Sequence, residues 1–206
     1  MTRGLARLLG GMLLLAPGLA RAAGDPALLP VASLDVALGQ AEKTPDFAKR
    51  YALLAPVVDG TFDLAQILRS SVGLKWDEFS DADKAALSKV FRAFTICNYA
   101  ANFGADSGDK FVTLPDVRII HVTSVENHVV DTEIVPKEGD PVKISYVMRL
   151  GDAGWRAVDV LQQGVISQAA VQRSDFRALL EAGGAAKLVE SLTAKVRELS
   201  GGAVTP

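Results

Sequence analysis

Residues 142–150 alternate between apolar and polar side chains almost without error, and this pattern constrains the fold more than any other. One face carries Val142, Ile144, Tyr146, Met148 and Leu150. A period of two is typical of an antiparallel strand with one buried face. The Gly- and Asp-containing segment 151–154 then predicts a hairpin turn, and 155–161 a returning strand. A sheet must therefore be part of the fold.

Further strands are predicted upstream of this hairpin. Residues 117–125 and 129–135 are rich in β-branched side chains and predict a second hairpin that turns around 126–127. Residues 111–114 predict a short edge strand. We therefore expect a twisted, mostly antiparallel sheet of four to five strands.

Helical spacing precedes and follows the predicted sheet. Asp63 is placed to cap a short helix that ends at Gly73, and Ser80 with Asp83 has the spacing of a capping box. The next helix carries an apolar stripe at three-to-four spacing, made of Leu87, Val90, Phe91, Phe94, Cys97 and Ala101. Helical spacing returns after the sheet and is interrupted at 183–184. This order predicts an α+β domain whose helices cover one face of a curved sheet.

The first 22 residues have the pattern of an export signal. A start with two arginines is followed by an apolar stretch over 8–20, and Ala20 and Ala22 offer small residues at the cleavage spacing. The alternative is an uncleaved membrane anchor, but this stretch is shorter than the roughly 20 residues that span a bilayer core. We predict a cleaved signal peptide over 1–22 and one exported domain over 23–206.

Charge and cysteine content restrict the possible functions. The formal net charge is −2, and it becomes −5 when Arg3, Arg7 and Arg21 leave with the signal peptide. Such a chain has no basic surface that would indicate nucleic-acid binding. Cys97 is the single cysteine and has no partner within the chain. We predict that it is a buried small apolar residue; the alternative, a catalytic thiol, would need a nearby histidine and an electropositive site.

Catalytic and metal-binding motifs are absent from the sequence. It contains no G-x-S-x-G elbow, phosphate loop, H-E-x-x-H or C-x-x-C motif. The two histidines, His121 and His128, lie seven residues apart. A two-histidine metal site is possible in principle, but no carboxylate stands at regular ligand spacing. We expect one partly buried and one exposed strand histidine, and neither a metal nor a cofactor.

Asp159 is an acidic residue inside an apolar strand, between Val158 and Val160. A carboxylate in such surroundings must be paired or protonated. It is either a structural group that binds the end of a backbone segment or a general base at the bottom of a pocket.

Two blocks of the sequence resemble the MlaC family of periplasmic phospholipid-binding, toluene-tolerance proteins. The first block has, in order, Phe62-Asp63-Leu64-Ala65, Val72-Gly73, Trp76, Ser80, Phe91, Phe94 and Tyr99. The second has Trp155-Arg156-Ala157-Val158-Asp159-Val160, Gly164-Val165, Arg173-Ser174-Asp175-Phe176, Gly183-Gly184 and Leu188. The two ordered blocks span most of the expected mature chain.

One departure from the family pattern indicates a branch. Arg173 follows Gly164 by nine residues, whereas the family commonly has eight. Together with the segments 97–103 and 171–176, this spacing is most similar to the hopanoid-biosynthesis-associated, HpnM-like members. The cargo implied by this branch is a rigid polycyclic lipid rather than a lipid with paired acyl chains.

The resemblance implies an NTF2-like sheet with an added helical part, enclosing an apolar lipid cavity. It also implies a periplasmic carrier without enzymatic activity, which shuttles phospholipid or hopanoid-type lipid between membranes. We expect this carrier to be a monomer. Its partners would be inner- and outer-membrane complexes contacted transiently, the inner one an ABC transporter.

A carrier of this kind needs a cavity with apolar walls that exclude water, because each CH₂ group left in water costs about 0.8 kcal/mol. The predicted lipid-binding residues are Leu64, Ile67, Leu68, Phe91, Phe94, Tyr99, Tyr146, Met148, Val158 and Val160. Each of them can instead belong to an ordinary hydrophobic core. A ketosteroid-isomerase-like enzyme is the alternative function, with Asp159 and Tyr146 facing a steroid-sized pocket.

Overall fold

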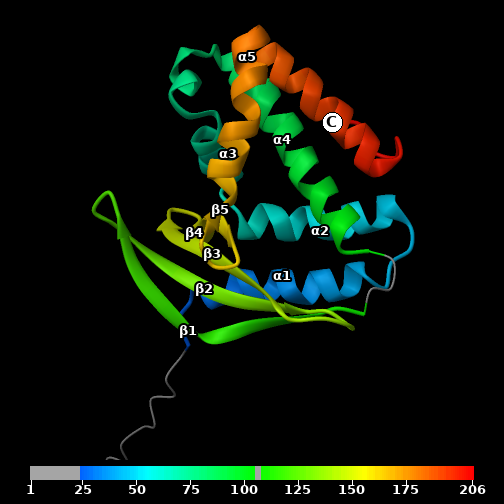
Figure 1. Ribbon diagram of the computed structural model, residues 1–206, viewed down its shortest axis with the longest axis vertical. Helices are drawn as coiled ribbons and strands as arrows, with labels where there is room; N and C mark the ends of the chain where they lie inside the picture. Colours follow the sequence, from blue (N-terminus) through cyan, green and yellow to red (C-terminus); the bar gives the residue numbers. More distant parts are fainter. Residues whose placement is uncertain (1–23, 105–107) are drawn as a thin grey trace, which may run out of the picture.

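The sheet is antiparallel throughout and lies beneath a layered helical part (Figure 1). The computed structural model describes residues 24–104 and 108–206, so the predicted signal peptide lies outside the described residues. The elements are α1 (Leu28–Ala41), α2 (Phe47–Thr61), α3 (Leu64–Val72), the 3₁₀ helix η1 (Gly73–Glu78), α4 (Asp81–Asn102), β1 (Lys110–Val122), β2 (Val125–Val135), β3 (Val142–Gly151), β4 (Gly154–Gln162), β5 (Ile166–Ser167) and α5 (Gln168–Ser200). The strand order is β1-β2-β3-β4-β5, which confirms the predicted α+β fold class.

The hairpin of β1 and β2 turns earlier than the sequence predicted. Thr123 and Ser124 form the turn, with φ values of 50° and 65°, so the prediction around 126–127 was wrong. Two residues in the left-handed region are what a tight hairpin requires, although Gly or Asn is more usual there. The segment 111–114 is not a separate edge strand but the first part of β1, which continues through an irregularity between Thr113 and Val117.

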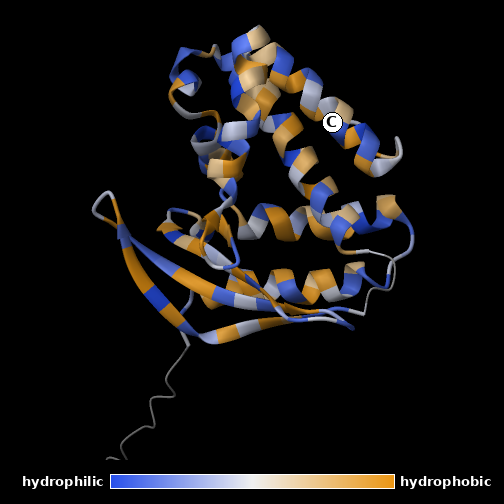
Figure 2. Ribbon diagram, viewed as in Figure 1, coloured by the Kyte–Doolittle hydropathy of each residue, from blue (hydrophilic) through white to orange (hydrophobic). Residues whose placement is uncertain are grey.

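The alternating strand β3 buries the middle of its apolar face. Tyr146 and Met148 belong to the main hydrophobic core, whereas Val142 and Leu150 at the strand ends are 45% and 61% exposed. The opposite face is less open than its polar residues suggest, because Ser145 on that face is fully buried. Along the strands, apolar and polar residues alternate (Figure 2).

A charged cluster covers the face of the sheet on which Ser145 lies. The Ser145 hydroxyl donates to Asp131 at 2.5 Å, and Arg118 and Lys143 form ion pairs with the same carboxylate at 3.0 and 2.9 Å. Burial alone would raise the pKa of Asp131, but the hydrogen bonds from these three side chains outweigh it and hold the pKa at about 2.

Helix ends follow the predicted capping. Asp63 accepts a hydrogen bond from the Gln66 backbone N–H at 2.9 Å, and Ser80 accepts one from the Asp83 N–H at 3.1 Å. Gly73 ends α3 with φ 72°. On α4 the buried seam runs through Ala100 rather than the predicted Ala101, which is exposed. None of the described helices combines the length and hydrophobicity that a bilayer crossing requires.

Helix α1 lies along the sheet, α2 lies over α1, and the longer helices stand above them (Figure 1). Helix α5 is kinked at Gly183 and Gly184, as the sequence predicted; Gly184 has φ 61° and ψ −147°. Its first half contacts α3, and its second half packs on α4, where Cys97 meets Val196. Cys97 is fully buried and unpaired, and burial raises the pKa of its thiol to about 11, so the prediction of an apolar role is confirmed.

Candidate functional site

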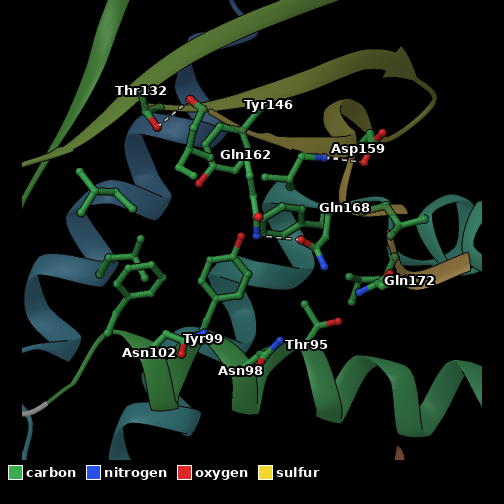
Figure 3. Close-up of a pocket in the computed structure, with 18 of the residues that line it drawn as sticks. Thr95, Asn98, Tyr99, Asn102, Thr132, Tyr146, Asp159, Gln162, Gln168 and Gln172 are labelled. Atoms are coloured by element: carbon green, nitrogen blue, oxygen red, sulfur yellow. Dashed lines mark hydrogen bonds between the residues drawn. The ribbon is translucent and has the colours of Figure 1, made fainter. Parts of the chain in front are cut away.

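A cavity of about 240 Å³ lies between the sheet and the helices (Figure 3). Its walls come from α1, α3, α4, the first four strands and the first turns of α5. The apolar and aromatic lining residues are Leu38, Phe62, Leu64, Ile67, Phe91, Phe94, Tyr99, Phe103, Phe111, Ile134, Ile144, Tyr146 and Val160. The other lining residues are Asp35, Thr95, Asn98, Asn102, Thr132, Asp159, Gln162, Gln168 and Gln172.

Aromatic rings form a continuous part of the cavity wall. The ring of Tyr99 lies 5.5 Å from that of Phe62 and 5.9 Å from that of Phe103. Phe103 in turn meets Phe111 edge-on at 5.4 Å, and Phe62 lies 6.1 Å from Tyr146. These spacings are those at which tilted and edge-on aromatic pairs attract each other. Helix α4, strand β1 and strand β3 are thereby joined across the cavity.

The phenols of Tyr99 and Tyr146 interact with each other inside this wall, and each affects the pKa of the other. Figure 3 shows Tyr99 rising from α4 toward the sheet that carries Tyr146. Burial raises the pKa of both phenols above its ordinary value, so both are neutral near pH 7. Asp35 of α1 accepts a hydrogen bond from the Thr113 hydroxyl at 2.6 Å, and burial raises its pKa more than this bond lowers it.

Asp159 holds the beginning of α5. Its carboxylate accepts hydrogen bonds from the Ser167 hydroxyl at 2.5 Å and from the backbone N–H groups of Ala169 and Val160 at 3.1 and 2.8 Å. Ser167 is the N-cap of the helix, where a negative charge is favourable. Of the two predicted roles, the structural one is confirmed: the carboxylate binds the end of a backbone segment.

Seven of the ten predicted lipid-binding residues line the cavity. They are Leu64, Ile67, Phe91, Phe94, Tyr99, Tyr146 and Val160. The other three do not: Leu68 and Met148 are fully buried in the main hydrophobic core, and Val158 is buried where the β3–β4 pairing shifts register. Lipid contact by the seven stays a prediction.

Several lining residues were not predicted. Phe62 was part of the recognised motif, and its aromatic character was a usable signal. The three glutamines around the start of α5 carried no such signal in the sequence, because polar residues at the end of a strand or the start of a helix are expected to be solvated. Asp35 was also missed, since its helix showed no clear amphipathic pattern in the sequence.

The histidines lie away from the cavity. His121 is exposed, whereas the His128 ring stacks on Trp155 at 4.2 Å and its Nδ1 lies 2.7 Å from an Asp25 carboxylate oxygen. This matches the expectation of one exposed and one partly buried histidine. Within residues 24–104 and 108–206 there is no group of three His, Cys, Asp or Glu side chains arranged to hold a metal.

Comparison with known proteins shows which family the chain resembles in sequence and which solved structure it resembles in fold. The model of the MlaC protein family matches residues 34–194. No curated protein matches the sequence. A solved structure of a phospholipid-binding protein from Ralstonia solanacearum, in complex with a phospholipid, is similar in fold with a TM-score of 0.66. The match has 19% sequence identity and covers 86% of this chain and 99% of the Ralstonia chain.

Proposed function

Because the chain belongs to the MlaC family, we propose that it is a periplasmic lipid-binding carrier. It takes up a phospholipid or a hopanoid-type lipid and shields the apolar part while crossing the space between two membranes. It acts as the soluble, monomeric component of an ABC-transporter-linked system and contacts the inner- and outer-membrane complexes only transiently. A signal peptide cleaved after Ala22 directs it to the periplasm.

The cavity of about 240 Å³ with its aromatic and aliphatic walls is the observation that carries this proposal. A single long acyl chain exposed to water costs more than about 10 kcal/mol, at about 0.8 kcal/mol for each CH₂. A carrier must offset this cost with apolar contacts. The wall that joins α4 to the sheet supplies them. The Ralstonia protein, which has the same fold, was solved with a phospholipid bound, and this adds support.

The choice of cargo rests on the resemblance to the HpnM-like branch. A hopanoid is a flat, rigid ring system, and such a shape packs well against aromatic rings. The rings of Phe62, Tyr99 and Phe103 lie within 6 Å of a neighbouring ring along one wall. This arrangement is compatible with either cargo, so both lipids belong in the first experiment.

The isomerase alternative gains no support from Asp159. A general base needs a free oxygen directed at the substrate, whereas this carboxylate accepts three hydrogen bonds, two of them from the start of α5. Asp159→Asn distinguishes the two functions. A carrier loses folding stability and keeps its lipid, whereas an isomerase loses turnover.

Native mass spectrometry of the mature chain, purified without detergent, tests the proposed function. The expected spectrum contains the chain from Ala23 together with a lipid of discrete mass, and solvent extraction identifies that lipid. A lipid-free protein that also takes up no lipid from vesicles contradicts the proposal. Detection of a chain that still begins at Met1 contradicts the cleavage.

A pair of matched variants locates the lipid. Phe94→Glu puts a charge into the cavity wall and is expected to abolish the lipid adduct. Leu74→Glu puts the same charge on a side chain that is 92% exposed and outside the cavity, and is expected to leave the adduct unchanged. Circular dichroism shows whether both variants are folded. Equal lipid retention by the two would place the lipid elsewhere.

A further inference from the structure

The described lining of the cavity offers carboxyl groups and no cation to an anionic lipid headgroup. Lys, Arg and His are absent from its lining within the part of the chain that the structure describes. The lining carboxyl groups are those of Asp35 and Asp159. A phosphate drawn inside would lose its water, meet no cation and lie near two acidic groups, and each of these effects is unfavourable.

Neutral amides take the place that cations would occupy. The lining contains five carboxamides, Asn98, Asn102, Gln162, Gln168 and Gln172. Figure 3 shows the three glutamines above Thr95 and Asn98, which lie below them on α4. An amide both donates and accepts hydrogen bonds, as does a hydroxyl group, so the two are matched in chemistry.

The glutamines are positioned by their own contacts. Gln162 donates to the Gln168 side-chain oxygen at 3.0 Å, which leaves the amino group of Gln168 available. Gln172 Oε1 is hydrogen-bonded to Ser71 Oγ at 2.8 Å, and the other end of this amide is available as well. Since Gln168 and Gln172 lie one turn apart at the start of α5, they present both free ends on the same face of the helix.

We infer that the cavity selects lipids whose polar part is uncharged and carries hydroxyl groups, such as a polyol or sugar, over lipids with an anionic phosphate. This inference rests on the proposed carrier function and narrows its cargo. The apolar part of the lipid lies against the aromatic wall, and the hydroxyl groups meet the amides of α5 and α4. A second carrier of the same fold with cations at these positions would have the opposite preference.

A competition experiment tests the selectivity. The delipidated mature chain is mixed with equal amounts of glucosyldiacylglycerol and phosphatidylglycerol that have identical acyl chains, and the adducts are counted by native mass spectrometry. We expect about tenfold more of the neutral adduct, the effect of one or two net hydrogen bonds. Equal adducts, or an excess of phosphatidylglycerol, overturn the inference and leave the carrier function standing. Failure to bind either lipid overturns the inference, and the carrier function falls with it when the chain also takes up no hopanoid.

Three variants connect the selectivity to the amides. Gln172→Leu is expected to reduce the preference about 3- to 10-fold, and Gln172→Lys is expected to favour phosphatidylglycerol. Gln40→Leu, on the exposed face of α1 outside the cavity, is the control and is expected to leave the preference unchanged. An unaltered preference in both Gln172 variants, with far-ultraviolet circular dichroism like that of the parent, overturns the inference.

Discussion

Tyr99 and Tyr146 show how single polar groups are accommodated in an apolar wall. Each phenol is a polar neighbour of the other where water is scarce. A hydrogen bond between two neutral groups contributes little net stability, but leaving one group buried and unpaired is costly. The two tyrosines therefore depend on each other more than on the aromatic residues around them.

Removing one phenol is expected to cost more than half of what removing both costs. Tyr99→Phe or Tyr146→Phe should each lower the free energy of unfolding by about 1–3 kcal/mol, because a buried hydroxyl loses its partner. The double variant leaves neither unpaired, so its loss should be smaller than the sum of the two. Urea denaturation of the three delipidated variants measures this. Strictly additive losses would show that the phenols are independent.

The charged cluster around Asp131 predicts a loss of stability in acid. Its pKa is about 2 in the folded chain and about 4 when unfolded, so its contribution is complete above about pH 4 and is lost as the pH falls toward 2. Asp131→Asn removes this contribution at every pH. The stability difference between the parent and this variant should therefore shrink between pH 6 and pH 2.5, as measured by urea unfolding. Asp152→Asn, in an exposed turn, serves as the control; a difference independent of pH contradicts the assignment.

For single residues, the sequence indicated which residue types surround the cavity, but not which of the individual apolar residues line it. Leu68 and Ile67 are adjacent on one helix and equally apolar, yet only Ile67 reaches the cavity. Met148 shares a strand face and a core cluster with Tyr146, but of the two only Tyr146 lines the cavity. The difference depends on tertiary packing, since a periodic pattern specifies a face and not the depth at which the neighbouring element lies.

Helix α5 is the element on which the site depends most. Asp159 and Ser167 bind its first N–H groups, Gln168 and Gln172 line the cavity, and the kink at Gly184 turns the second half onto α4. The kink was visible in sequence because two adjacent glycines rarely continue a helix. The anchoring was harder to foresee, since it joins a strand residue to the backbone N–H of Ala169, ten residues later in the chain.

The kink predicts opposite effects for two glycine substitutions. Gly184→Ala should destabilise the chain by about 1 kcal/mol, because φ is 61° there and a side chain is strained in the left-handed region even with open space around it. Gly39→Ala, inside α1 and also without neighbours within 4 Å, should stabilise it by about 0.5–1 kcal/mol. Thermal unfolding of the two variants compares them. Stabilisation by both would mean that the kink is not required.

The turn between β1 and β2 marks the limit of element prediction. Gly151 and Gly154 indicated the second hairpin, and its position was predicted correctly. Thr123 and Ser124 adopt the left-handed region without any glycine, so the first turn was placed a few residues late. Strand existence was predictable from β-branched content. The ends of the strands were not predictable where the turn residues were not the Gly, Asn or Asp that usually mark a turn.

For the whole molecule, the cavity joins the two parts of the fold. Its walls combine one face of the sheet with four helices, so no single element encloses it. A dry void of about 240 Å³ would cost about 6 kcal/mol by the cost measured for cavities in other cores. Polar residues at its edge admit water and lower this cost, but water cannot replace the contacts that an apolar ligand makes. The fold is therefore expected to be most stable when it is filled.

Removal of the lipid is expected to lower the melting temperature. A ligand at 100 times its dissociation constant adds about 2.7 kcal/mol, which corresponds to about 5–10 °C for a chain of this size. Differential scanning calorimetry of the lipid-bound and the extracted protein measures the shift. Phe94→Glu should show no such difference, because it carries no lipid. Identical melting of both parent samples would mean that the lipid does not bind the folded state preferentially.

Cys97 gives access to the kinetics of one motion. Its thiol is buried between α4 and the second half of α5, while the next two residues of α4, Asn98 and Tyr99, line the cavity. A thiol-reactive reagent can modify it only in molecules in which these two helices have separated. The rate of modification therefore measures the rate of that separation, and it reports on a side of α4 different from the one that faces the cavity.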